Sequence, residues 1–287
     1  MHPAPSLILF TTLSGLGLGG LAWALFALGA GPSHAAIMMV AFTWALTGAG
    51  LMFSTAHLKN PKNAWRSFTQ PGSSWLSREA WLAVLTLAIA PLVSFAVATG
   101  RLPGAAVALP IVLCILTVLA TAMIYTQLKT VPRWHTGWTP FLFVILSLAG
   151  GAMLTGRSAD AIGLLLPAGA ALAAYWLSGD NRVRQSQSSM NTATGLTHGT
   201  VRAFEMPHTG DNYLLKEMVH VVARKHARRL RYIGFGLAIL VPVLLLTLVP
   251  ALPIWLVLAV HLAGVLATRW LFFAEAEHVV GLYYGKR

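Results

Sequence analysis

Long apolar runs alternate with polar connections along the whole chain. Each run approaches the ~20 predominantly apolar residues that a helix needs to cross a bilayer. The pattern predicts an all-α, polytopic membrane protein with a single membrane domain over residues 1–287. It places eight transmembrane helices at residues 7–28, 35–56, 80–99, 105–125, 140–155, 161–177, 232–249 and 252–273.

Two connections are far longer than a turn between helices requires. Residues 53–81 read FSTAHLKNPKNAWRSFTQPGSSWLSREAW and hold three Trp, one His and four basic residues. Residues 178–229 form the longest polar region. Within it, apolar residues recur at helical spacing from Leu214 to Val222 and lead into a basic run. We therefore predict a loop with an amphipathic basic helix.

Composition and charge agree with a membrane protein and give it an orientation. Hydrophobic residues make up 56% of the chain, charged residues 10%, and the mean hydropathy is +0.69. The net charge is +12, and 17 of the 20 Lys and Arg residues lie on one side, 15 in the connections and two in the C-terminal tail. The positive-inside rule makes that side, with both termini, the cytoplasmic side of the membrane.

The distribution of the charge also restricts the partners. The basic residues are spread over several inter-helix loops rather than along one soluble face, which argues against nucleic-acid binding. Basic loops at a membrane surface instead favour contact with lipid head groups or with a partner protein. We expect membrane lipids among the partners.

The chain lacks the residues of a self-contained catalyst. Its one cysteine, Cys114, lies inside an apolar run, so there is no CxxC motif, intrachain disulfide or iron–sulfur cluster held by this chain alone. No nucleotide, zinc or hydrolase motif is present. We expect no metal site and no redox centre of its own.

His57 and Glu79 lie at the two ends of the first long connection, where ionisable groups are costly and often functional. An imidazole can bond a quinone carbonyl and exchange its proton near neutral pH, and Glu79 can relay protons to or from water. In the alternative interpretation both are polar residues at helix ends, with Glu79 favoured at a helix N-terminus.

Further ionisable groups lie in the last predicted helix and just beyond it. His261 is at mid-span, where it is either a haem ligand paired with His57 or a core histidine bonded between helices. His57 and His261 fall at different depths, which argues against haem. Arg269 and Glu275, nearly two turns apart, are candidates for an ion pair. A stand-alone transporter would need more polar groups at the midplane than His261.

Several segments resemble the membrane anchor family of the dimethyl sulfoxide reductase type. The segments HLKNPKNAWRSF, SSWLSREAW and MIYTQLKTVPRWHT carry the resemblance, and RAFEMPHTGDNYLLKEM and ARKHARRLR resemble a proteobacterial branch of it. The resemblance implies an eight-helix anchor in a complex with an iron–sulfur subunit and a molybdopterin catalytic subunit. The anchor of that family holds no metal and exchanges electrons with ubiquinone or menaquinone.

The same resemblance assigns residues. The histidine of the family's H-L-x-N-P motif matches His57, and the acid of its S-R-E motif matches Glu79. Both are predicted as the catalytic pair, and His57 also as a quinone ligand. Two cations are predicted beside Glu79, where they help to set the quinone potential and the proton path: Lys59 and Arg78. Three aromatic residues are predicted to line the quinone pocket: Trp65, Trp81 and Tyr125.

The predicted orientation selects a branch of the family. With its basic, terminus-bearing face in the cytoplasm, the chain resembles the membrane subunit of the cytoplasmic sulfite dehydrogenase, a sulfite:quinone oxidoreductase, more than it resembles the dimethyl sulfoxide reductase anchor. Electrons would then pass from sulfite through the partner's clusters to quinone. The alternatives are a quinol-oxidising anchor of a dimethyl sulfoxide reductase-like enzyme and a haem-carrying cytochrome b subunit.

Overall fold

The computed structural model describes residues 2–56, 60–186, 188–196, 198–205, 208, 210, 218 and 226–284, and these contain helices and no strand. Seven of the described helical segments are long and apolar enough to cross a membrane, and one further apolar helix, α5, is shorter. The long segments are α1 (Pro5–Ala30), α2 (His34–Ala56), α3 (Trp75–Ala98), η2–α4 (Gly104–Val107, Ala108–Thr126), α6 (Ser158–Gln185), α8–η5–α9 (Ala227–Phe235, Gly236–Leu240, Val241–Leu248) and α10 (Ile254–Ala274).

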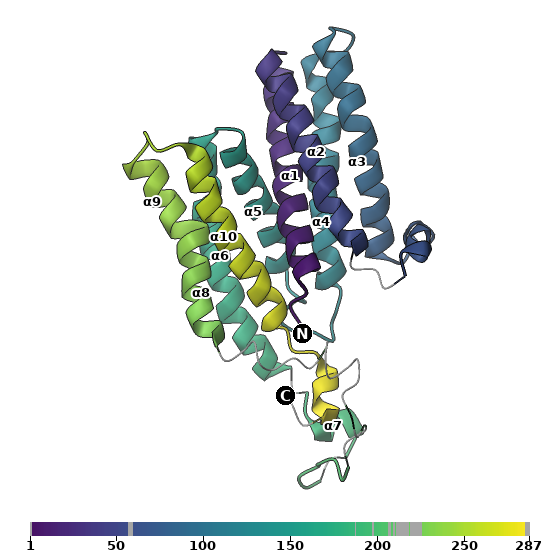
Figure 1. Cartoon of the computed structure of the whole chain (residues 1–287). Coiled ribbons are helices and arrows are strands. Elements are labelled where there is room, and N and C mark those ends of the chain that lie inside the picture. Colours follow the sequence, from purple (N-terminus) through teal and green to yellow (C-terminus); the bar gives the residue numbers. More distant parts are fainter. Residues whose placement is uncertain are drawn as a thin grey trace.

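The helices form two neighbouring groups (Figure 1). One group holds α1–α4, and the other holds α5 (Trp138–Leu154), α6, α8–α9 and α10. Three short helices lie at the end of the bundle where α1 begins and α10 finishes: η1 (Pro61–Phe68), α7 (Met190–Thr194) and η6 (Val279–Tyr284). We call this end the terminus-bearing face.

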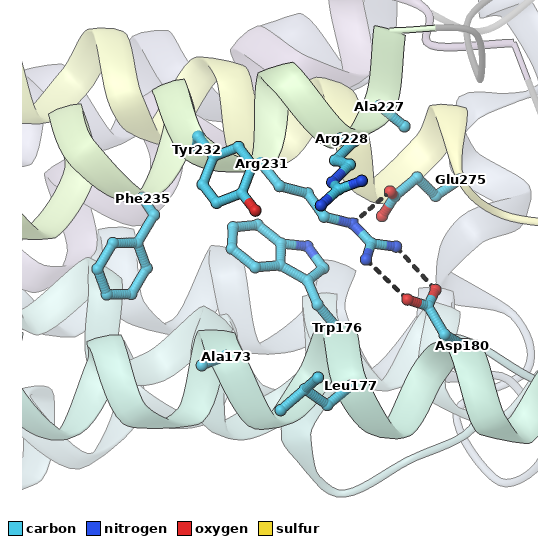
Figure 2. Close-up of a pocket in the computed structure, with 10 residues that line it drawn as sticks. All are labelled: Ala173, Trp176, Leu177, Asp180, Ala227, Arg228, Arg231, Tyr232, Phe235 and Glu275. Atoms are coloured by element: carbon cyan, nitrogen blue, oxygen red, sulfur yellow. Dashed lines mark hydrogen bonds and ion pairs between the residues drawn. The ribbon is translucent and has the colours of Figure 1, made fainter.

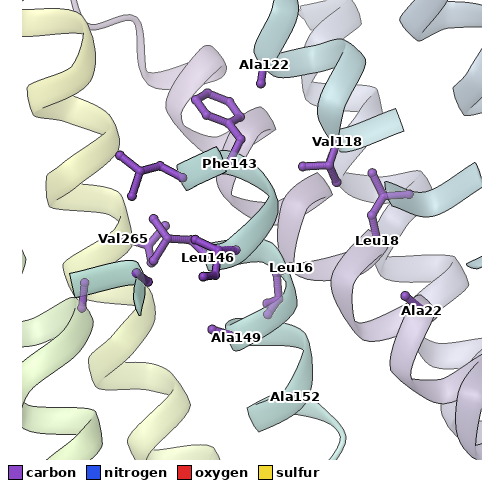
Figure 3. Packing of buried hydrophobic residues seen from close by; sticks show 14 of the residues in the cluster. Leu16, Leu18, Ala22, Val118, Ala122, Phe143, Leu146, Ala149, Ala152 and Val265 are labelled. Carbon is purple, nitrogen blue, oxygen red and sulfur yellow. The ribbon is translucent and has the colours of Figure 1, made fainter. Parts of the chain in front are cut away.

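Glycines bring the two groups into backbone contact. A Cβ atom on Gly19 of α1 would overlap the carbonyl group of Ser147 in α5, and one on Gly151 of α5 would overlap the backbone of Gly19. Small residues allow this close approach of membrane helices, where dispersion contacts replace the hydrophobic effect as the driving force. The apolar core continues from this crossing through α1, α4, α5 and α10, and Figure 3 shows Leu16, Phe143, Leu146 and Val265 packed there.

At two of the prolines within the membrane helices, side chains from neighbouring helices replace the hydrogen bonds that the prolines remove. Pro91 of α3 has no N–H for the carbonyl of Leu87, and the indole of Trp44 in α2 donates to that oxygen at 2.9 Å. Pro242 of α9 likewise leaves the carbonyl of Ala238 without its helical donor. The imidazole Nδ1 of His261 in α10 lies 2.7 Å from that oxygen.

The contact of His261 with the Ala238 carbonyl lies where the helix changes from α-helical to π-helical geometry. Residues Gly236–Leu240 form a single π-helical turn between α8 and α9. A Cβ on Gly264 of α10 would overlap the backbone at Ala238, so α10 packs directly against this turn. His261 is therefore a core histidine bonded between helices, as one of the two interpretations of the sequence predicted.

The helices differ from the predicted spans beside both long loops. Helix α3 begins at Trp75 rather than at residue 80, which places Glu79 inside the helix. Helix α6 continues past residue 177 to Gln185, and α8 begins at Ala227 rather than at residue 232. The extensions of α6 and α8 carry charged residues that a hydropathy pattern assigns to a loop; their ion pairs, described below, allow the helices to continue. Most of the predicted amphipathic helix lies outside the described residues, which include only Met218 between 211 and 225.

Candidate functional site

Glu79 lies in the second turn of α3 and faces α4. Its side chain is buried, with 5% of the residue exposed. The hydroxyl of Thr121 in α4 is in hydrogen-bond contact with the Glu79 Oε1 atom. The same hydroxyl lies 3.1 Å from the carbonyl oxygen of Thr117.

This contact makes the Glu79 carboxyl group suited to proton exchange. A hydroxyl group carries one proton and two acceptor positions. When Thr121 donates to Glu79, the carboxyl group can be ionised; when Thr121 donates to Thr117, only a protonated Glu79 can keep the bond. The pair accommodates both protonation states of the carboxyl group without moving a helix.

The connection before α3 folds over the start of that helix. The guanidinium group of Arg78 donates to the carbonyl oxygens of Pro71 at 2.8 Å and Gly72 at 2.6 Å, and lies 4.5 Å from the centre of the Trp75 ring. Trp81 donates from its indole to the Phe68 carbonyl at 3.0 Å. Arg78 and Trp81 thus hold the connection against α3, next to Glu79.

The structure gathers part of the predicted site. Tyr125 follows Thr121 by one turn on the same face of α4 and is buried, with its ring packed edge-on against Trp134. Trp65 and Trp81 are 61% and 45% exposed, at the surface of the terminus-bearing face. His57 and Lys59 lie outside the described residues. Thr121 is a residue that sequence reasoning missed, although its spacing from Thr117 marks a polar stripe in an apolar helix.

A second polar centre lies in the other helix group, where four charged side chains form one cluster. Figure 2 shows three of them, Asp180, Arg231 and Glu275. Asp180 of α6 accepts from Arg133 at 2.7 Å and from two nitrogens of Arg231, each at 2.8 Å. The Arg231 Nε atom also donates to Glu275 at 2.7 Å. The cluster joins the α4–α5 connection, α6, α8 and the end of α10.

The predicted ion pair between Arg269 and Glu275 is replaced by other contacts. Six residues along a helix correspond to about 600°, so the two side chains leave α10 in different directions. Glu275 pairs with Arg231, whereas the Arg269 guanidinium carbon lies 3.5 Å from the centre of the Phe143 ring. Arg269 is buried, so this cation–π contact supplies part of the stabilisation that an acid would give.

The surroundings of His261 do not fit a haem. The cavity beside the ring has a volume of about 10 Å³, and a Cβ on Gly150 would lie 3.5 Å from the His261 Nε2 atom. The Nδ1 atom is already engaged by Ala238. Among the residues that the structure describes, no three His, Cys, Asp or Glu side chains gather in a way that could hold a metal ion.

Comparison with known proteins shows which family the chain belongs to. Residues 1–275 match the family described as DMSO reductase anchor subunit (DmsC). The chain belongs to this family. The match runs from the first residue to Glu275 and so includes all the spans, Glu79 and the charged cluster. The chain is thus a multi-pass membrane anchor subunit of an oxidoreductase complex.

Individual relatives agree with the family. The C subunit of the sulfite dehydrogenase of Allochromatium vinosum is 33% identical over 99% of both proteins. Two anaerobic dimethyl sulfoxide reductase proteins of Escherichia coli are similar over shorter regions. The YnfH protein is 32% identical over 39% of this chain and 41% of its own length, and the C component is 30% identical over 39% and 40%. No solved structure matches the anchor subunit.

Proposed function

We propose that this anchor subunit carries electrons between iron–sulfur clusters of a partner subunit and quinone in the membrane. The buried Glu79–Thr121 pair carries the proposal, because a carboxyl group that tolerates both protonation states is what a quinone needs where it takes up or releases protons. Glu79 is buried two residues before the exposed Trp81, whose indole bonds the Phe68 carbonyl of the preceding connection, and this position supports access for a quinone at the membrane interface.

Reduction of one quinone to quinol consumes two electrons and two protons. His57 would bond one quinone carbonyl and pass it a proton, and Glu79 would supply protons from the terminus-bearing face. Arg78 and Lys59 are the cations that would favour a reduced, negatively charged head group. Tyr125, Trp65 and Trp81 are the proposed pocket walls, with Tyr125 deepest because it is buried.

Sulfite is the proposed electron source. The relative from a sulfite dehydrogenase is similar over 99% of this chain, whereas the two relatives from dimethyl sulfoxide reductases are similar over 39%. A molybdopterin subunit would oxidise sulfite and an iron–sulfur subunit would pass the electrons to quinone. The second candidate, a quinol-oxidising anchor of a dimethyl sulfoxide reductase-like enzyme, rests on the shorter similarities.

The proposed topology has eight spans, namely the seven long segments and the shorter helix α5. Both termini lie on the cytoplasmic side of the bacterial inner membrane. Helix α5 has 17 residues, at the lower limit of what can cross the hydrocarbon core. A fluorescent protein fused after the last residue should fluoresce in cells, and an alkaline phosphatase fused there should be inactive. An active phosphatase fusion would reverse the assignment of sides.

The quinone step is tested with the purified three-subunit complex. We expect Glu79→Gln to leave sulfite-dependent reduction of an artificial acceptor unchanged and to lower reduction of a soluble quinone at least roughly tenfold, the effect of losing one positioned proton-transfer group. Asp160→Asn in α6 is the matched control, since it alters a carboxylate of an exposed ion pair with Arg157. Parallel loss of both activities in Glu79→Gln would place Glu79 outside the quinone step.

A further inference from the structure

A cavity of about 670 Å³ lies between α6 and α8 on the terminus-bearing side of the second helix group (Figure 2). Its volume is in the range of sites that hold small molecules. One part of its wall is apolar and aromatic, with Trp176, Leu177 and Phe235, and the other part is charged, with Arg228 and Arg231. Glu79 belongs to the other helix group, so this cavity is separate from the proposed quinone site.

Two acids and two cations line the cavity, and a third cation, Arg133, bonds the lining residue Asp180 without lining the cavity itself. Within the cluster, Arg133 and Arg231 are balanced by Asp180 and Glu275. Arg228 adds a further cation, is exposed, and makes no ion pair with any residue that the structure describes. The cavity thus offers net attraction to one negative charge.

Arg231 keeps donors available in addition to those in the cluster. A guanidinium group has five N–H bonds, and Arg231 uses three of them, one to Glu275 and two to Asp180. Arg228 precedes Arg231 by three residues, so both lie on one face of α8. Two guanidinium groups on one face, with free N–H bonds, are suited to the oxygens of a phosphate group.

The apolar wall continues onto lipid-facing surface. Leu177 and Tyr232 are 70% and 69% exposed, and Leu240 and Leu244 extend an exposed apolar surface along the same span as α8. An aromatic ring at the level of the head groups, such as that of Trp176 or Tyr232, is typical of the membrane interface. A ligand that fits both walls has an anionic head and long hydrocarbon chains.

We infer that the cavity between α6 and α8 binds an anionic phospholipid, with its phosphodiester group at Arg228 and Arg231 and an acyl chain along Leu177 and Phe235. Basic pockets between membrane helices are known to select anionic head groups. Because Arg231 also ties α8 to α6 and α10, a bound lipid would strengthen the contact among these three helices. The inference does not depend on the proposed quinone chemistry.

The test measures thermal unfolding of the full chain purified in a non-ionic detergent. Phosphatidylglycerol added as mixed micelles should raise the midpoint by several degrees, whereas phosphatidylcholine and inorganic phosphate should not. Arg228→Gln should lose at least half of the rise, and Arg229→Gln, which changes an exposed arginine outside the cavity wall, should keep it. Ala173→Phe, whose ring fills the apolar end of the cavity, should also lose the lipid-induced rise of the midpoint. It replaces Arg228→Gln as the test if that variant does not fold.

Each opposite result overturns the inference. An equal rise of the unfolding midpoint with phosphatidylcholine would mean that the site does not distinguish the charge of the head group. An equal rise with inorganic phosphate would mean that the acyl chains contribute nothing to binding. Equal losses in Arg228→Gln and Arg229→Gln would indicate a diffuse basic surface. If Arg228→Gln kept the lipid effect but failed to retain the iron–sulfur subunit during purification of the complex, the cavity would be a protein-docking surface instead.

Discussion

The imidazole Nδ1 atom of His261 lies 2.7 Å from the carbonyl oxygen of Ala238, in the position where a helix would normally supply the N–H of residue 242. Residue 242 is a proline, so the histidine replaces a backbone donor that the sequence removed. A bond of this kind is worth more in a membrane than on a surface, because hydrocarbon offers no alternative partner to an open carbonyl group.

Replacing His261 should therefore destabilise the bundle. We expect His261→Leu to lower the free energy of unfolding by about 1–3 kcal/mol, the cost of a buried acceptor without a partner. In the double variant with Pro242→Ala, the new N–H of residue 242 can reach the same oxygen, and at least half of the loss should be recovered. Denaturation of the purified chain in detergent measures both effects. A double variant no more stable than His261→Leu would show that His261 acts through packing alone.

The contact between the two helix groups should tolerate no side chain at Gly19. We expect Gly19→Ala to lower the free energy of unfolding by about 1–3 kcal/mol or more, because its Cβ would overlap Ser147 of α5. Gly48→Ala in α2 is the control, since no atom lies within 4 Å of the position of its Cβ. Thermal unfolding of the two variants should separate them; similar midpoints would mean that α1 and α5 can move apart at no cost.

The charged cluster should contribute more to the free energy of unfolding than a partly exposed ion pair does. The Glu275 side chain is 4% exposed, and removing its charge leaves Arg231 with Asp180 as its one acidic partner among the described residues, so Glu275→Gln should cost about 3 kcal/mol. The pair of Arg157 with Asp160 has side chains 33% and 39% exposed, so Asp160→Asn should cost less than about 1 kcal/mol. Chemical denaturation measures the difference, and equal costs would contradict the assignment of the cluster as a structural tie.

Thr121 should influence the quinone reaction through Glu79. We expect Thr121→Val to lower quinone reduction by the complex roughly tenfold, corresponding to about 1.4 kcal/mol, while artificial-acceptor activity stays unchanged. Thr86→Val is the matched control, because Thr86 bonds Thr117 in the same interface and has no contact with Glu79 among the interactions of the described residues. A loss of the same size in Thr86→Val would point to the packing of α3 against α4 rather than to proton transfer.

Much of the fold was open to prediction from sequence, and part of the site was not. The apolar runs located most of each helix, whereas the contact of Gly19 in α1 with Gly151 in α5 emerged only from the structure. The structure shows Glu79 buried, and its role in the quinone step stays a prediction. The Thr121 contact was not predicted, because a threonine in an apolar helix usually bonds its own backbone and its spacing from Thr117 does not tell which neighbouring helix the polar stripe faces.

The sequence by itself determined the class of protein and the apolar part of each span, because a bilayer imposes length and apolarity on each span separately. Its motifs also indicated the anchor family. Tertiary structure alone decided the pairings: Arg231 rather than Arg269 for Glu275, Trp44 for the carbonyl opened by Pro91, and His261 for the one opened by Pro242. Such pairings depend on which helix faces join, and that depends on the packing of the whole bundle rather than on any single segment.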